Sequence, residues 1–150
     1  MVSVLFHLTD WQQYPGVDNP QSIMHQWIHN CKSLGVDRLI MIDSTTYHIG
    51  QYYNHVSSDI LFKRYTTLDE CINDNIGENF IFLEINDKST CLTKFIHPES
   101  AICVVGPNHN SVVSSSEPYA WLLIPSNINY ALYDHAAINI TLYDRLLKTM

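Results

Sequence analysis

Two histidines at helical spacing are the first residues of this sequence that could do chemistry. His25 and His29 are four residues apart in a segment predicted to be helical, and this spacing can chelate a metal ion. No cysteine or carboxylate extends the same predicted helix face to complete a ligand set. We therefore favour two histidines on a solvated helix face, and we expect no metal.

A second group of residues has the side-chain types of a hydrolase. Asp134 and His135, with a serine such as Ser111, supply the three groups of a catalytic triad. The serine of α/β-hydrolases sits in a Gly-x-Ser-x-Gly turn, and the chain has no such motif. Hydrolase chemistry therefore has almost no support.

Two proline-containing turns form a third candidate. Gly106-Pro107 follows the apolar run 102–105, and Pro125 follows the apolar run 121–124. Continuous apolar runs that end at Gly or Pro are typical of strands buried on both faces of a parallel sheet. Ligands bind at the carboxyl ends of such strands, so both turns are candidates for a binding site. The local sequence by itself favours ordinary strand terminators.

The rest of the chain alternates between strand and helix patterns. Strands are predicted for residues 2–8, 38–43, 60–65, 80–85, 101–105 and 121–125, with helical segments between several of them. This order predicts a three-layer α/β fold with a mostly parallel sheet. Neither a G-x-G-x-x-G motif nor a P-loop motif occurs, which excludes the ordinary dinucleotide-binding and P-loop classes.

Helix boundaries are marked by residues with well-understood end preferences. Asn19 fits the N-cap of the first helix, Pro20 its first position and Gly35 its end. The sequence Thr67-x-x-Glu70 is a capping box that opens a second helix. A last helix is predicted to start near Ala131.

The last helix carries two apolar stripes. One contains Leu132, Ala136, Ile140, Tyr143 and Leu147, and the other contains Ile138, Leu142 and Leu146. A sheet of this size can cover only one face of a terminal helix, so the other needs a different partner. We therefore expect a homodimer that packs through this helix.

Composition sets the general class of the protein. The chain has 150 residues, 46% of them hydrophobic, which fits one compact domain over residues 1–150. The formal charge of −7 argues against non-specific binding to nucleic acid. The four cysteines lack a Cys-x-x-Cys pair, and no leader or membrane-spanning run is evident. We expect a soluble cytoplasmic protein with reduced thiols.

A polar segment rich in Tyr and His, from Tyr47 to His55, follows the second predicted strand. Such side chains could stack on nucleotide bases. They could equally belong to a loop that covers a sheet edge. Because basic neighbours are missing, the second interpretation is favoured.

Three segments, in order along the chain, resemble the motifs of the SpoU (TrmH) group of SPOUT RNA methyltransferases. They are Asn19–Asp37, Val104–Ser111 and Ile124–Asp144. The resemblance implies a trefoil knot near the carboxyl end, S-adenosylmethionine held by the knot loops, and a homodimer packed through the knot and last helix. It places the cofactor against the main chain around Leu83, Glu84, Gly106, Pro107, Ile124, Pro125, Ala131 and Leu132.

The reactive side chains of the family's motifs are replaced in this chain. The arginine expected near Ile28 or His29 is missing, and the glutamate that follows Gly-Pro has become Asn108. The Ser-Leu-Asn of the third motif is replaced by residues 131–133, Ala-Leu-Tyr. A 2′-O transfer needs a group that takes the hydroxyl proton and a cation beside the phosphate. The available substitutes are His29, Lys32 and His109.

Two classes of function remain open. The chain is either an S-adenosylmethionine-dependent RNA 2′-O-methyltransferase of divergent sequence, or a knotted protein without transfer chemistry. The second would bind RNA, a nucleotide-like ligand or a protein partner, and the missing motif residues with the acidic charge favour it.

Overall fold

Seven parallel strands form one sheet in the computed structural model, which describes residues 1–7, 20–43, 60–84, 87–105, 120–125, 132 and 134–150. The strands are β1 (Val2–His7), β2 (Arg38–Ile42), β3 (Leu61–Tyr65), β4 (Phe80–Leu83), β5 (Thr90–Cys91), β6 (Ala101–Val104) and β7 (Ala120–Leu123). The helices are α1 (Pro20–Ser33), α3 (Leu68–Asp74), α4 (Asp134–Thr149) and the short 3-10 helix η2 (Leu92–Lys94). The order across the sheet is β3-β2-β1-β6-β4-β7-β5.

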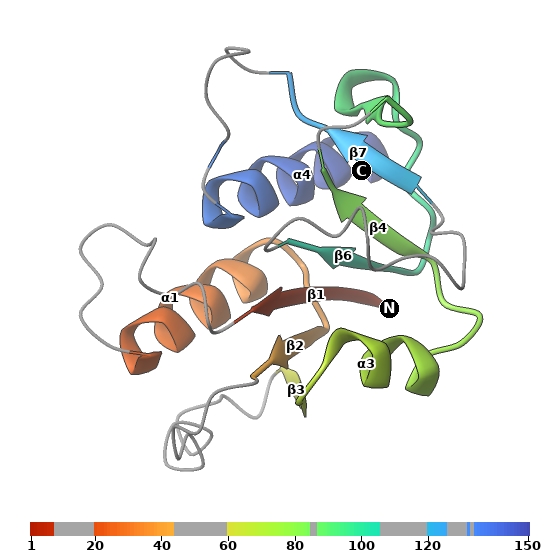
Figure 1. The fold of residues 1–150 in the computed structure, drawn as a ribbon. Helices are drawn as coiled ribbons and strands as arrows, with labels where there is room; N and C mark the ends of the chain where they lie inside the picture. Colours follow the sequence, from red (N-terminus) through yellow and green to blue (C-terminus); the bar gives the residue numbers. More distant parts are fainter. Residues whose placement is uncertain (8–19, 44–59, 85–86, 106–119, 126–131, 133) are drawn as a thin grey trace.

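The sheet is the middle of three layers, because its side chains alternate between two apolar cores. Val4 and Phe6 of β1 join a core with Trp27 of α1 and Ile138 of α4. Leu5, between them, joins a second core with residues of α3. Figure 1 shows α1 and α4 side by side along the sheet, with α3 apart from them near β2 and β3. The predicted three-layer fold is confirmed, and every described strand pairing is parallel.

The first helix begins and ends where its sequence predicts. It starts at Pro20, and Gly35 has a φ of 78°, a conformation that glycine adopts with little strain. The amide of Val36 donates to the carbonyl of Cys31 at 2.9 Å, and the amide of Gly35 donates to Lys32 at 3.3 Å. These two bonds form the helix-ending Schellman motif. Asn19, the expected N-cap, lies outside the described residues.

The predicted capping box is present at the start of α3. Thr67 Oγ1 accepts a hydrogen bond from the Glu70 amide at 3.2 Å. The Glu70 carboxylate accepts one from the amide of Thr66, also at 3.2 Å, rather than from Thr67. The helix ends at Asp74, three residues before Gly77, the glycine that follows it with a φ of 91°.

Three element boundaries differ from expectation. The segment 86–97, predicted as a polar connection, contains β5 and η2. Helix α4 begins at Asp134 rather than near Ala131, because Ala and Leu favour helix but do not mark its start. Strand β7 ends at Leu123, since Pro125 has no amide hydrogen and restricts the residue before it.

The parallel arrangement gathers the carboxyl ends of the strands at one edge of the sheet (Figure 1). The segments 8–19, 44–59, 85–86, 106–119 and 126–131, which lie outside the described residues, follow β1, β2, β4, β6 and β7 in the sequence. None of the described helices is long and apolar enough to cross a membrane.

Candidate functional site

The carboxyl ends of β4, β6 and β7 are neighbours. In the strand register, Phe82 of β4 is opposite Val104 of β6 on one side and Trp121 of β7 on the other. The amide of Glu84 donates to the carbonyl of Leu122 at 3.2 Å, which extends the pairing beyond β4. On the far side of β6, the amide of Val105 donates to Leu5 at 3.1 Å. The strand ends that precede the predicted turns therefore lie together.

Of the residues expected to contact a cofactor, Leu83, Glu84, Ile124 and Pro125 end or closely follow strands at this edge. Leu83 and Glu84, at the end of β4, are half-buried, and Leu83 packs against the core shared with α1 and α4. Ile124 is also half-buried against that core, and Pro125 is exposed. Leu132 is 39% exposed. Gly106, Pro107 and Ala131 lie outside the described residues.

The residues expected to replace the missing arginine lie on α1. His29 and Lys32 are both exposed, and Lys32 is in the last turn of the helix. Because α1 runs antiparallel to the strands, its last turn lies near the start of β1, where Asp37 donates to Val2. The structure therefore places Lys32 at the opposite edge from the strand ends of its own chain. His109 lies outside the described residues.

Helix α1 packs against α4 through aromatic and polar side chains. The Trp27 ring stacks on Phe6 with centroids 4.8 Å apart, and the His135 ring centroid lies 5.1 Å from that of Trp27. The amide of Asn30 donates to His135 Nε2, so this nitrogen carries no proton. Burial lowers the pKa of His135, which agrees with a neutral ring. His135 thus packs between the two helices, while Ser111, the serine considered for a triad with it, lies outside the described residues.

An ion pair between a buried carboxylate and a partly exposed arginine lies at the carboxyl ends of β2 and β3. The Asp43 side chain is fully buried, and Arg64 Nε donates to its Oδ2 at 3.2 Å. No local sequence pattern connects Arg64 to Asp43, which lies 21 positions earlier in the chain. The available signal was a carboxylate directly after an apolar strand, because a charge at the end of a buried strand needs a partner.

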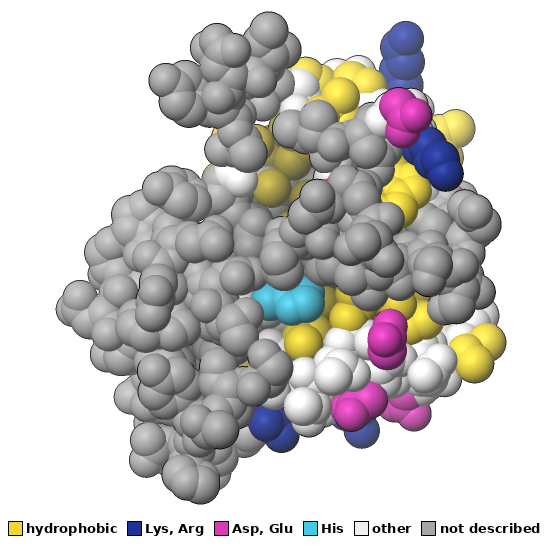
Figure 2. Space-filling model, viewed as in Figure 1, with side chains coloured by type: hydrophobic (Ala, Val, Ile, Leu, Met, Phe, Trp, Pro, Cys, Tyr) yellow, Lys and Arg dark blue, Asp and Glu magenta, His cyan; other side chains and the backbone are white. Residues whose placement is uncertain are grey.

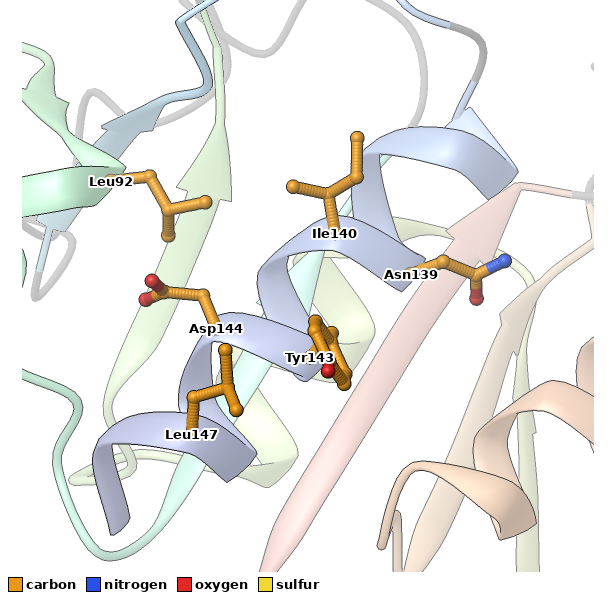
Figure 3. Close-up of a pocket in the computed structure, with 6 residues that line it drawn as sticks. All are labelled: Leu92, Asn139, Ile140, Tyr143, Asp144 and Leu147. Carbon is orange, nitrogen blue, oxygen red and sulfur yellow. The ribbon is translucent and has the colours of Figure 1, made fainter. Parts of the chain in front are cut away.

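The outer stripe of α4 is exposed and lines a groove. Ile140 is 42% exposed, and Tyr143 and Leu147 are each 57% exposed, whereas Ile138 and Leu142 on the other stripe are buried. Leu92 faces this stripe across a groove of about 380 Å³ (Figure 3). The prediction that the sheet covers only one of the two stripes is therefore confirmed.

A polar network fixes the end of α4 to the segment before β6. His97 Nε2 donates to the Asp144 carboxylate at 2.8 Å, and Lys148 Nζ lies 2.9 Å from the same oxygen. Burial lowers the pKa of His97, so the ring is neutral and donates its proton. Burial raises the pKa of Asp144, but hydrogen bonds from Lys148 and His97 outweigh it and the net shift is downward.

The two half-buried histidines, His97 and His135, predict a pH dependence of stability. Their folded-state pKa values are lowered, so between the folded value and about 6.5 the unfolded chain binds more protons than the folded one. Their contribution to stability is therefore complete above about pH 6.5 and is lost as the pH falls. Urea unfolding should show a lower midpoint at pH 5.5 than at pH 7.5.

The matched control for this effect is a variant with both rings replaced, His97→Gln and His135→Gln. Glutamine keeps a donor and an acceptor but does not titrate. The decrease in the midpoint between pH 7.5 and 5.5 should become smaller in this variant. An unchanged decrease would mean that other groups cause it.

Metal chemistry, and reactions of the three buried thiols, have little support in the described part of the chain. No cluster of three or more His, Cys, Asp or Glu suited to a metal occurs among the described residues. All four cysteines are free, as expected, and Cys31, Cys71 and Cys103 are buried. Burial raises the pKa of each of these three thiols to about 12, so they are protonated near neutral pH.

Comparisons with known proteins identify the fold. No protein-family model and no curated protein matches the sequence. Among solved structures, the chain is similar to the TrmH/SpoU tRNA modifying enzyme of A. aeolicus, with a TM-score of 0.65, 14% identity, and coverage of 98% of this chain and 74% of that enzyme.

Two further structures contain S-adenosylmethionine. The first is the AdoMet-bound rRNA methyltransferase of Sinorhizobium meliloti (TM-score 0.67, 14% identity, 99% of this chain and 57% of that chain). The second is the SpoU methyltransferase AviRb of Streptomyces viridochromogenes in complex with AdoMet (TM-score 0.66, 14% identity, 98% and 57%). The chain thus spans little more than half the length of these two proteins.

The architecture is therefore a three-layer α/β fold with a parallel sheet. More specifically, the chain has the fold of the SpoU (TrmH) RNA methyltransferases, as the sequence resemblance implied.

Proposed function

We propose that the chain binds S-adenosylmethionine at the carboxyl ends of β4, β6 and β7 and transfers its methyl group to a ribose 2′-hydroxyl of RNA. The observation that carries the proposal is the juxtaposition of these three strand ends in a chain with the SpoU fold. Two of the solved structures with this fold are S-adenosylmethionine complexes. The cofactor supplies the electrophilic methyl group.

The residues present at this edge fit such a cofactor. Leu83 and Ile124 offer half-buried apolar surface, which suits an adenine ring. The other contacts would come from main-chain groups of Glu84, Gly106, Pro107, Pro125, Ala131 and Leu132. Contacts of this kind do not depend on side-chain identity, so they tolerate the divergent motifs. A trefoil knot formed by residues after β6 is part of this proposal.

A homodimer through α4 would complete the site. The exposed stripe of Ile140, Tyr143 and Leu147 supplies an apolar surface for a second copy, and α1 lies beside α4 in the same layer. The exposed face of α1 would then flank the dimer interface and bring His29 and Lys32 towards the partner's strand ends. In this arrangement His29 takes the hydroxyl proton, and Lys32 stabilises the adjacent phosphate.

The second candidate is a protein of the same fold that binds RNA or another ligand without methyl transfer. The observation that favours it is the position of Lys32, at the edge opposite the strand ends of its own chain. A single copy therefore brings no described substitute for the missing arginine to the cofactor edge. Transfer chemistry then depends entirely on the partner copy or on His109.

Methyl transfer to RNA separates the two candidates. With labelled S-adenosylmethionine and total unmodified RNA, the wild-type chain should incorporate label into ribose. His29→Ala should reduce incorporation at least about 100-fold, because it removes the general base. His25→Ala is the matched control, since it removes an exposed histidine one turn away and should retain activity. Equal activity of His29→Ala and wild type would remove His29 from the mechanism.

A further inference from the structure

The chain has few arginines, and most of them make contacts that stabilise the fold. Of the three arginines, Arg38 at the start of β2 donates to Ser3 at 2.9 Å and pairs with Glu78 at 3.0 Å. Arg145 donates to the main-chain carbonyls of Pro98 and Glu99 just before β6. Both therefore act at the amino ends of the strands. Only Arg64 lies at the carboxyl ends of the strands, on the same edge of the sheet as the proposed site but three strands from β6.

Arg64 is held in a defined orientation and is partly open to solvent. Its Nε donates to the Asp43 carboxylate at 3.2 Å, and Nη2 donates to the Asp43 carbonyl at 3.4 Å. The Asp43 side chain is fully buried, whereas that of Arg64 is 41% exposed. Among the described residues Nη1 has no partner. One side of the guanidinium is anchored, and the other can donate to a ligand.

An anchored guanidinium suits a phosphate. Its planar arrangement of donors matches phosphate oxygens, and it stays charged at any working pH. Anchoring by Asp43 reduces the side-chain entropy that binding would otherwise cost. On the face drawn in Figure 2, the Lys and Arg side chains of the described residues are separated and do not form a continuous basic patch.

The position of Arg64 in the sheet limits what it can touch. It pairs in register with Met41, and Met41 pairs with Phe6 near the end of β1. Three strand spacings separate β3 from β6, about 14 Å. A stacked nucleic-acid strand covers that distance in about four nucleotides at ~3.4 Å each. Arg64 is thus too far from the proposed cofactor edge to contact the reacting ribose.

We propose that Arg64, oriented by the buried Asp43 carboxylate, binds a backbone phosphate of the RNA substrate several nucleotides from the methylated ribose. The inference rests on the proposed function for the identity of the ligand. It assigns Arg64 to substrate binding and not to the transfer step.

The test is the affinity for a short, fluorescently labelled single-stranded oligoribonucleotide at several salt concentrations. Arg64→Gln should weaken binding about tenfold, the effect of one charged hydrogen bond. The slope of log affinity against log salt should decrease by about 0.7, because one phosphate contact is lost. Lys63→Gln is the matched control, since it removes the neighbouring charge; the Lys63 ammonium lies 5.4 Å from the Tyr65 ring centroid.

A second variant separates phosphate binding from neutralisation of Asp43. Arg64→Gln leaves a buried carboxylate with one partner fewer and so lowers the thermal midpoint. The double variant Asp43→Asn/Arg64→Gln removes that charge and should recover stability without recovering RNA affinity. Recovery of RNA affinity in the double variant would overturn the proposal. The proposal would also fail if Arg64→Gln left RNA affinity unchanged, or if Lys63→Gln weakened it as much as Arg64→Gln.

Calorimetry with S-adenosylmethionine on the same samples keeps the two proposals distinct. Arg64→Gln should bind the cofactor as wild type does. If wild type binds no cofactor but the Arg64 effect on RNA persists, methyl transfer fails and the phosphate contact stands. If wild type binds the cofactor but Arg64→Gln leaves RNA affinity unchanged, the proposed phosphate contact is wrong and the proposed cofactor binding stands.

Discussion

Gly106→Val should weaken S-adenosylmethionine binding strongly while the chain stays folded. Gly106 directly follows Val105, whose amide bonds to Leu5 at the carboxyl end of β1. If the cofactor contacts main chain after β6, a branched side chain at the first residue of that turn occupies the space the cofactor needs. Overpacking of this kind costs about 1–3 kcal/mol, so affinity should fall by up to about 100-fold.

A size series supplies the control. Gly106→Ala adds one methyl group and should weaken binding less than Gly106→Val, as measured by calorimetry. Thermal unfolding of both variants should resemble wild type, since the substitution lies beyond the buried strand. Wild-type affinity in Gly106→Val would show that the cofactor does not approach this turn.

Leu147→Glu converts the proposed homodimer to a monomer. Leu147 is 57% exposed and lines the groove on the outer stripe of α4 with Ile140 and Tyr143. In a two-fold symmetric interface each substitution occurs twice, so two carboxylates would be buried without partners. A buried unpaired charge costs about 3–5 kcal/mol, so the dimer should dissociate at least about 100-fold more readily.

Leu61→Glu is the matched control for this experiment. Leu61 is 58% exposed, almost the same as Leu147, but it lies on the edge strand β3. Sedimentation should find a dimer for wild type and Leu61→Glu, and a monomer for Leu147→Glu. A monomeric wild type, or a Leu147→Glu variant that stays dimeric, contradicts an interface through α4.

Much of the fold can be predicted from local patterns. Pro20 and Gly35 act through their own backbone preferences, so they mark the ends of α1 whatever surrounds them. Continuous apolar runs such as 102–105 identify strands buried on both faces and hence a parallel sheet. The two stripes of α4 likewise predict one buried and one exposed face.

Other features depend on contacts that local patterns do not contain. Strand β5, Thr90–Cys91, pairs with β7 alone among the described strands. Two residues are too few to show the alternation of side chains by which a strand is predicted. The order of the strands across the sheet cannot be predicted from the sequence either, because an apolar run does not indicate which strand it pairs with. The start of α4 was predicted too early, since Ala131 and Leu132 are good helix formers in any setting.

The candidate site also combines features that the sequence predicts with features that it does not. The turns after β6 and β7 were visible in the sequence, and the structure brings the ends of those strands together beside β4. The link between Asp43 and Arg64 was not visible, because the two residues are 21 positions apart and meet only through the pairing of β2 with β3.

Calorimetric titration of the wild-type chain with S-adenosylmethionine and with its demethylated product tests the central claim most directly. The proposed cofactor site at the ends of β4, β6 and β7 should bind both ligands with a Kd below about 1 mM, the upper range for enzyme substrates. No heat of binding from either ligand at millimolar concentration would contradict the account.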